Sequence, residues 1–345
     1  MLAIQEHLDR VHHVLAERYA GLRELARGKN GIVLSAHRGD PRGPALALKV
    51  AYPVDEGTEE PDSVLRFRRE CEIGSALNHP HILRVSRPTM EDGVEFCEME
   101  FVGPMRLDQL VTAPKPPSFR RVLDVMHELA DALDYAHAHG VVHGALTPSR
   151  VLLDAGGHVH VKGFMLLRDV EATHPALTPA AVGNSAFMAP EQWKLPAVNR
   201  SVDVYAAGIL AWELCTGVRR VSMDGSGIPE IRPITIPPDR PLRDGIPLYV
   251  NAAIRRATSR DPVNRFATVG EFVAALSNPA KALGASQPTL RPVLYRRRTS
   301  LTMPLAIVLA IATVVGLAVP SAPRERAMGW LKTSVESIRT AGAIR

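Results

Sequence analysis

The sequence predicts an α+β domain over residues 19–278 and one transmembrane helix near the C-terminus. The first supporting observation is the composition, because 46% of the 345 residues are hydrophobic and 22% are charged. That balance allows a sizeable core and argues against an unfolded chain. The second is Leu301–Val319, a run of 19 residues without a charge, which is about the length that crosses a bilayer core. The third is an ordered series of short motifs within residues 19–278.

The two ends of the chain set the remaining boundaries. Charged residues interrupt 1–18, so this segment lacks the apolar run of a signal peptide and is predicted to form a short amphipathic helix. Segment 279–300 is rich in proline and arginine and is predicted to be a basic juxtamembrane linker. Its arginines 296–298 predict that the side before the apolar run stays in the cytoplasm. Residues 320–345 would then be a short extracytoplasmic tail. A buried core helix is the alternative for 301–319.

The positive charge of the chain is concentrated at its C-terminal end. Segment 279–300 has five basic residues and no acid, and 301–345 has five basic and two acidic residues. Because the whole chain carries +5, residues 1–278 carry −3. The main domain therefore lacks the basic excess of a nucleic-acid-binding protein, and no nucleic-acid partner is expected. The three cysteines fit no zinc-binding spacing and are predicted to be buried, reduced thiols: Cys71, Cys97 and Cys215.

Glycines and a lysine mark the first half of the domain. The stretch LARGKNGIV places Gly28 and Gly31 where a loop could bring backbone N–H groups close to phosphates. An apolar strand that ends at Lys49 follows, and then a segment predicted to be a helix that carries Glu70. Residues 95–102 read EFCEMEFV, a further predicted strand. A lysine at the end of one apolar strand is more often a solvated rim residue, so its significance depends on the order of the neighbouring motifs.

The second half of the domain continues the series. A predicted helix leads to His143, and the tripeptide APE ends at Glu191. Asp203 begins the apolar stretch DVYAAG, and Arg265 lies in RDPVNRF. Each motif alone is weak evidence, but about eight of them in one fixed order are strong evidence for a fold.

In this order, the motifs resemble those of eukaryotic-type Ser/Thr protein kinases, including bacterial membrane-anchored ones. The resemblance implies a two-lobed fold, with a small β-rich N-lobe to about residue 102 and a large helical C-lobe. It implies that Lys49 meets the α- and β-phosphates of ATP and pairs with Glu70. Further implied nucleotide contacts are Gly28, Gly31, Val33, Ala47, the gatekeeper Met99, Glu100, Val102 and Leu152. Plain core packing is the alternative for the apolar ones. The implied structural residues are His143, Phe164, Glu191, Asp203 and Arg265.

The residues that perform catalysis in such kinases are absent. Kinases use an aspartate to orient the hydroxyl group, and an asparagine and a second aspartate to hold Mg²⁺. These positions match Ala145, Arg150 and Gly163 in this chain. Alanine cannot act as a base, and glycine offers no oxygen ligand to a hard cation. The sequence therefore predicts no catalytic residue, no metal ligand and no bound Mg²⁺. Arg150 would either meet a phosphate directly or point to solvent or a local acid.

Other departures lie outside the metal positions. Gly74, one turn after Glu70, stands where kinases usually have a large apolar residue, which predicts a loosely seated helix. Asn184 replaces a threonine that usually contacts the catalytic aspartate. Candidate phosphorylation sites in the activation segment are Thr173, Thr178 and Ser185.

These observations predict a membrane-tethered pseudokinase that acts as a signalling scaffold or an allosteric regulator. Because the small-lobe residues persist, ATP is a candidate bound ligand without metal. The expected partners are proteins, either an active kinase or a domain that recognises phosphorylated threonine, and the membrane through 301–319. The expected location is a bacterial inner membrane, with the kinase-like domain in the cytoplasm. Two alternatives remain: an unconventional but active Ser/Thr kinase, and a protein-binding module that binds no nucleotide.

Overall fold

The computed structural model describes residues 2–28, 31–53, 62–103, 105–164, 186–193, 199–223, 229–231, 235–237 and 239–283. The chain divides into two units, Met1–Leu290 and Arg291–Arg345, and every described residue belongs to the first. The predicted membrane segment 301–319 and tail 320–345 therefore lie outside the described residues. Within the described ranges, no helix combines the length and the apolar character needed to span a bilayer.

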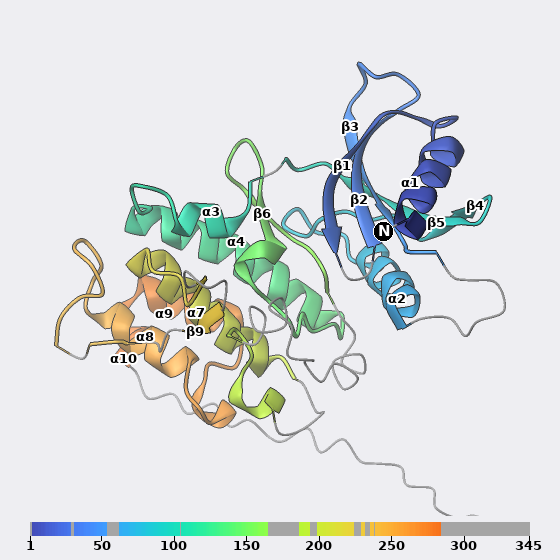
Figure 1. The fold of residues 1–345 in the computed structure, drawn as a ribbon. Helices are drawn as coiled ribbons and strands as arrows, with labels where there is room; N and C mark the ends of the chain where they lie inside the picture. Colours follow the sequence, from blue (N-terminus) through green and yellow to red (C-terminus); the bar gives the residue numbers. More distant parts are fainter. Residues whose placement is uncertain are drawn as a thin grey trace, which may run out of the picture. The chain divides into compact units, whose positions relative to one another are not determined.

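The described residues form two lobes, which confirms the predicted α+β architecture (Figure 1). The N-lobe has an antiparallel five-stranded sheet in the order β1-β2-β3-β5-β4. Two helices accompany this sheet. The elements of the lobe are α1 (Leu2–Leu15), β1 (Tyr19–Gly28), β2 (Gly31–Arg38), β3 (Ala45–Val50), α2 (Asp62–Ala76), β4 (Thr89–Glu91) and β5 (Val94–Glu100).

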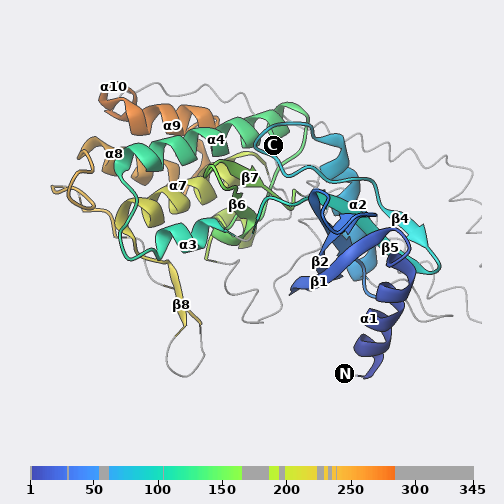
Figure 2. The ribbon, with the colours of Figure 1, turned by 90° about the horizontal axis from the view of Figure 1, so that it is seen from above.

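Alternation along the central strands decides what each face of the sheet meets. Leu34 on β2 and Leu48 on β3 are fully buried, and they pack with Val11 and Leu15 of α1. Helix α1 therefore covers this face of the sheet (Figure 2). Because successive strand residues point to opposite faces, Val33, Ala47 and Lys49 belong to the other face. The register places Val33 opposite Lys49, so these side chains reach the region between the lobes.

The C-lobe is mainly helical. Among its described residues, the α-helices are α3 (Leu107–Val111), α4 (Phe119–Ala138), α7 (Ser201–Thr216), α8 (Tyr249–Ala257), α9 (Val269–Ser277) and α10 (Pro279–Leu283). In the described part of this lobe, β6 (Val151–Leu153) pairs antiparallel with β7 (Val159–Val161), and β8 (Val221–Met223) pairs antiparallel with β9 (Pro229–Ile231). The 3-10 turns within the described ranges are η1 (Pro148–Arg150), η2 (Pro190–Trp193) and η3 (Pro262–Asn264).

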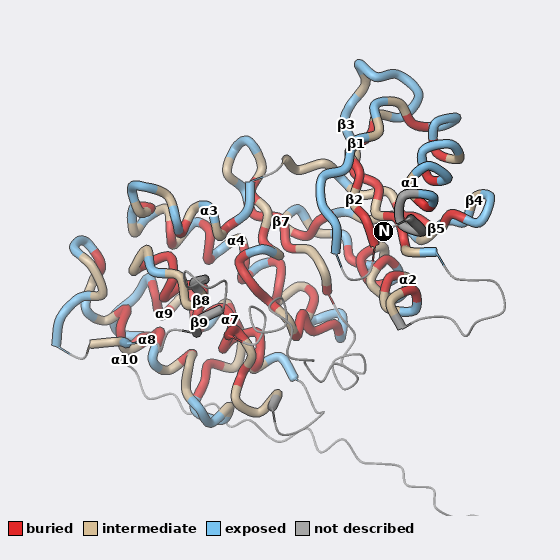
Figure 3. The backbone as a smooth tube through the Cα atoms, viewed as in Figure 1, coloured by how far each residue is buried: buried red, intermediate tan, exposed pale blue. Residues whose placement is uncertain are grey.

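Helix α7 is the centre of the C-lobe core. Fourteen of its sixteen residues are buried, and neighbours α3, α4, α8 and α9 enclose it (Figure 3). A helix that is apolar on every side is stable only when it is surrounded in this way. It ends at Gly217, which takes the left-handed conformation (φ 70°) that terminates many helices.

The folded part of the chain continues past the predicted start of the linker. Helix α10 occupies Pro279–Leu283 and packs on α8 and α9, with Ala282 buried. The boundary expected at 278 therefore falls inside a packed region, because sequence reasoning took the proline at 279 as the start of a linker. Proline at the first position of a helix is favourable, since its missing N–H would have no partner there.

Candidate functional site

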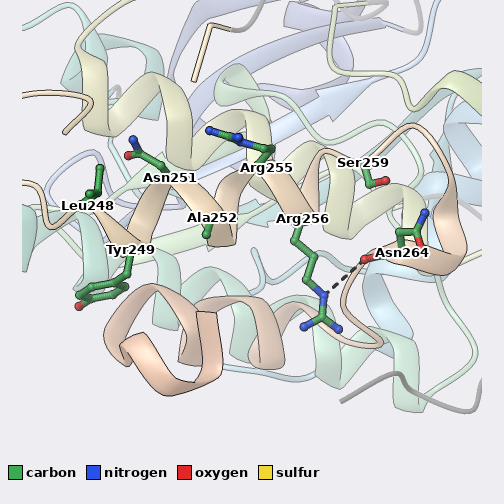
Figure 4. Close-up of a pocket in the computed structure, with 8 residues that line it drawn as sticks. All are labelled: Leu248, Tyr249, Asn251, Ala252, Arg255, Arg256, Ser259 and Asn264. Carbon is green, nitrogen blue, oxygen red and sulfur yellow. Dashed lines mark hydrogen bonds between the residues drawn. The ribbon is translucent and has the colours of Figure 1, made fainter. Parts of the chain in front are cut away.

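A cavity of about 530 Å³ lies between the two lobes. Residues from β1, β2, β3, α2, β5 and the β6–β7 hairpin line it, so both lobes contribute. A second hollow, of about 550 Å³, lies on the outer surface of α8 and the turn that follows it (Figure 4). Its charged lining residues are Arg255 and Arg256, and no acidic residue of the described chain lines it. The cavity between the lobes brings apolar walls from both lobes together with charges of both signs, so it is the candidate functional site.

One end of the cavity is apolar. Val33 and Ala47 line it from the N-lobe sheet, and Leu152 lines it from β6. Met99 and Val102 line the connection between the lobes. Two apolar walls with a strip of backbone between them fit a flat aromatic ring. The Glu100 N–H already donates to the Arg84 carbonyl at 3.0 Å, which commits that donor and leaves the neighbouring backbone groups to meet a ring.

Gly28 and Gly31 lie at the close of β1 and the start of β2, where they pair with each other. The two residues between them lie outside the described ranges. At Gly31 the backbone φ is +141°, and a Cβ atom would lie 2.0 Å from the Val50 carbonyl oxygen. Any side chain here would collide with the backbone of β3, so the close approach of these strands requires glycine.

Lys49 and Glu70 form an ion pair at the other end of the cavity. Lys49 Nζ donates to Glu70 Oε2 at 2.6 Å, which ties β3 to α2. Burial acts to raise the pKa of Glu70, but the Lys49 charge and hydrogen bond, with smaller contributions from Arg150 and Lys162, outweigh it and lower that pKa. Glu70 is therefore an ionised carboxylate committed to Lys49.

Arg150 and Gly163 meet where the resemblance places the metal ligands. Arg150 Nη1 donates to the Gly163 carbonyl at 2.8 Å. A Cβ atom at Gly163 would lie 2.8 Å from the same Nη1, so the guanidinium fills the space that a side chain at 163 would need. Gly163 has a φ of +81°. Arg150 thus turns inward, and the alternative that it points to solvent is wrong.

Sequence reasoning missed Lys162. Its N–H donates to the Arg150 carbonyl at 3.0 Å, which holds the two residues side by side. Burial lowers the pKa of Lys162, the Arg150 charge lowers it further, and Glu70 partly compensates. Burial likewise lowers the pKa of Arg150, again with Glu70 in compensation. The position of Lys162 directly before Gly163 was the available signal.

The loop that carries Ala145 is held from below by Asp203. Asp203 accepts hydrogen bonds from the N–H groups of His143 and Gly144, at 2.9 Å each, and from His137 Nε2 at 2.7 Å. His143 packs against the ring of Phe164. Burial lowers the pKa of His143 to about 4, so it is neutral at physiological pH. The loop is in place, but Ala145 brings only a methyl group to it.

Glu191 and Arg265 form a buried double hydrogen bond. Arg265 Nη1 and Nη2 donate to Glu191 Oε1 and Oε2 at 2.6 and 2.8 Å. Arg265 is completely buried and also donates to the Ser259 and Ser201 carbonyls. A bidentate arrangement of this kind fixes the turn η2 to the segment before α9. The same turn reaches the Ala145 loop, because Gln192 Nε2 donates to the Gly144 carbonyl at 2.8 Å.

Helix α2 is closely packed, which corrects the expectation raised by Gly74. A Cβ atom at Gly74 would lie 3.2 Å from Val85 Cβ and Cγ2, so Val85 fills the space that a larger side chain would take. The preceding turn adds a contact between Cys71 and Cys97, whose sulfur atoms are 2.8 Å apart. All three cysteines are free and buried, as the sequence predicted.

Mg²⁺ and ATP fit this cavity differently. Mg²⁺ requires oxygen ligands in near-octahedral geometry. The carboxylate of Glu70 is paired with Lys49. The guanidinium of Arg150 occupies the space that a metal-binding side chain at position 163 would need. Among the described residues, no group of three or more His, Cys, Asp or Glu could hold a metal ion. The cavity residues therefore do not fit Mg²⁺, whereas the apolar walls and cations of the cavity suit a nucleotide.

Residues 165–185, with Asn184 and the candidate sites Thr173, Thr178 and Ser185, lie outside the described part.

The two lobes, the cavity between them and the ion pair within it define the class of the domain. A protein kinase domain model matches residues 19–266. The chain therefore belongs to the protein kinase family, and its relatives are bacterial Ser/Thr kinases.

Curated relatives share less than a third of their residues with this chain. The serine/threonine-protein kinase PrkC of Bacillus subtilis is 29% identical over 61% of this chain and 33% of the relative. The probable serine/threonine-protein kinase PknB of Lactococcus lactis is 28% identical over 75% and 42%. The serine/threonine-protein kinase PknA of Mycobacterium tuberculosis is 29% identical over 82% and 66%. The matched region thus spans between one third and two thirds of the length of these relatives.

Proposed function

We propose that this chain is a membrane-tethered pseudokinase, which regulates or scaffolds other signalling proteins and does not transfer phosphate. The observation that carries the proposal is the contact between Arg150 and Gly163. It places a cation, and a residue without a side-chain oxygen, where a kinase holds its metal. Ala145 adds the absence of a base. Loss of general-base assistance alone lowers a rate by roughly 10²–10⁴-fold.

The rest of the domain supports a role that depends on its fold. The ion pairs Lys49–Glu70 and Glu191–Arg265 join separate elements, and Asp203 orders the loop around Ala145. These contacts hold a kinase-shaped surface together without needing chemistry in the cavity. We therefore propose that the domain binds protein partners, namely an active kinase or a domain that recognises phosphorylated threonine. The apolar segment 301–319 would hold the domain at the cytoplasmic face of a bacterial inner membrane.

Phosphoryl transfer by the purified full-length chain tests this proposal. The chain in detergent is incubated with γ-labelled ATP, Mg²⁺ or Mn²⁺ and a general protein substrate. We expect no label on the substrate or on the chain itself above the level of the Lys49→Met variant. Lys115→Met, which removes an exposed lysine that does not line the cavity, serves as the matched control. Transfer that Lys49→Met abolishes and Lys115→Met preserves would establish the active-kinase alternative instead.

A further inference from the structure

The charged end of the cavity contains more positive than negative side chains. Among its described lining residues, four are cationic and two are acidic: Lys49, Arg106, Arg150 and Lys162 against Glu70 and Glu100. Glu70 is paired with Lys49, and Arg106 with Asp108 outside the lining. Arg150 and Lys162 are left as two adjacent cations without a carboxylate of their own in hydrogen-bond contact in the described part of the chain.

Arg150 is held so that it can still donate. Its Nη1 is committed to the Gly163 carbonyl at 2.8 Å, while its other guanidinium N–H groups have no hydrogen-bond partner among the described residues. The backbone bond from Lys162 N–H to the Arg150 carbonyl keeps the lysine alongside it. A planar guanidinium fixed by one nitrogen presents the remaining donors in a set direction, which is the geometry that phosphate oxygens accept.

The electrostatics of this pair point to an anionic ligand. Burial and mutual repulsion lower the pKa of Lys162, and burial lowers the pKa of Arg150. Burial therefore destabilises both cations, and a bound anion would relieve that cost. A divalent metal would have the opposite effect, because it would add positive charge beside the guanidinium.

We propose that the cavity is a metal-independent site for a nucleoside polyphosphate, in which Arg150 and Lys162 contact the phosphates and Mg²⁺ weakens binding. The inference rests on the proposed function, because it concerns the same cavity and requires that no side chain at positions 150 and 163 coordinates a metal ion. It specifies what that function leaves open, namely the form of the ligand. The apolar end receives the base, and the cationic end receives the phosphates without a bridging ion.

Calorimetric titration of the full-length chain in detergent tests the proposal. The probes are ATP and AMP, each in EDTA and in excess Mg²⁺. In EDTA we expect ATP to bind at least about tenfold more tightly than AMP, the ratio that one charge-assisted hydrogen bond provides. Excess Mg²⁺ should weaken ATP binding by about the same factor and leave AMP binding unchanged. Tighter ATP binding with Mg²⁺, equal affinities for ATP and AMP, or no binding by the folded chain would each overturn the proposal.

Variants assign the effect to particular residues. Arg150→Met should remove most of the preference for ATP over AMP, and Arg200→Met, at an exposed position of the same lobe, should retain it. Arg150→Asn combined with Gly163→Asp removes the cation and supplies oxygen ligands, so Mg²⁺ should now strengthen ATP binding. If a variant fails to fold, as judged by circular dichroism, the effect of Mg²⁺ on the unsubstituted chain decides the matter alone.

The two proposals can fail separately. A chain that binds ATP more tightly with Mg²⁺ but transfers no phosphate would contradict the metal-independent site and leave the pseudokinase proposal standing. A chain that transfers phosphate would contradict the pseudokinase proposal, whatever its affinity for ATP in EDTA.

Discussion

At the scale of single residues, the substitutions in the cavity fit one another. Gly163 creates a space, and the guanidinium of Arg150 fills it and bonds to the Gly163 carbonyl. A side chain added at 163 alone would conflict with Arg150, because its Cβ atom would press on Arg150 Nη1. The two substitutions therefore act together: they exchange two oxygen ligands for one cation. The contact between the two side-chain positions is visible only in the structure.

A residue outside the cavity gives a prediction for pH dependence. Burial raises the pKa of Glu213 to about 7, and the hydrogen bond from the Arg220 N–H and the charge of Arg219 only partly offset it. The folded state thus holds this proton more tightly than the unfolded state, whose ordinary value is 4.5. The stabilisation by this group is complete below pH 4.5 and is lost as pH rises through 7.

Urea unfolding of Glu213→Gln at several pH values measures this effect. The variant cannot ionise, so its stability relative to the unsubstituted chain should improve between pH 5 and pH 8 by roughly 3 kcal/mol at most. The substitution also has a cost in stability that does not depend on pH. The prediction therefore concerns only the direction in which the stability difference changes with pH. A difference that stays flat across this range, or falls with pH, would contradict the assigned burial of the carboxylate.

At the scale of elements, the position of α2 decides whether Lys49 and Glu70 can meet. The helix is fixed to the sheet by that pair, by the contact of Cys71 with Cys97 and by the fit of Gly74 against Val85. The fit with Val85 takes the place of the large side chain that kinases usually have on this helix. An N-lobe with α2 seated in this way is compatible with ligand binding even without catalysis.

Exchanging the sizes of these two residues tests the fit. Gly74→Leu places a large side chain 3.2 Å or less from Val85, and such overpacking costs about 1–3 kcal/mol in the free energy of unfolding. Gly74→Leu with Val85→Ala should recover at least half of that loss, since the second change opens space for the first. Strictly additive effects in chemical denaturation would show that the two residues do not share this space.

The sequence could predict those parts of the site that depend on motif order. The pairing of Lys49 with Glu70 and of Glu191 with Arg265 could be proposed because each residue has a fixed place in the series. The inward direction of Arg150 could not, since it depends on the backbone of Gly163 and on the space left there. The Gly74–Val85 fit joins residues eleven positions apart through three-dimensional packing, which no local pattern reveals.

At the scale of the whole molecule, the domain and the apolar segment 301–319 together would restrict the chain to a membrane surface. The basic linker before that segment would add attraction to anionic lipid. A tethered partner-binding domain gains a high local concentration near other membrane proteins. Its regulation would then depend on position as much as on affinity.

Substitutions in the apolar segment test the tether. Leu309→Arg together with Val314→Arg should cost about 2.5–3.5 kcal/mol each in the insertion of a transmembrane helix. We expect the full-length chain to stay in the membrane fraction after alkaline carbonate extraction and the double variant to be released. Ser334→Arg with Thr340→Arg, in the segment after the apolar run, is the matched control and should remain in the membrane. Release of the unsubstituted chain would contradict the tether.

The central claim is that the cavity lacks the side chains that would coordinate a divalent metal ion. Electron paramagnetic resonance of Mn²⁺, titrated into the full-length chain saturated with ATP in EDTA-free buffer, tests it most directly. The account predicts that Mn²⁺ draws ATP off the protein and appears only as free and nucleotide-bound ion in solution. A stable signal from Mn²⁺ bound together with ATP and the chain, one that Lys49→Met removes, would contradict it.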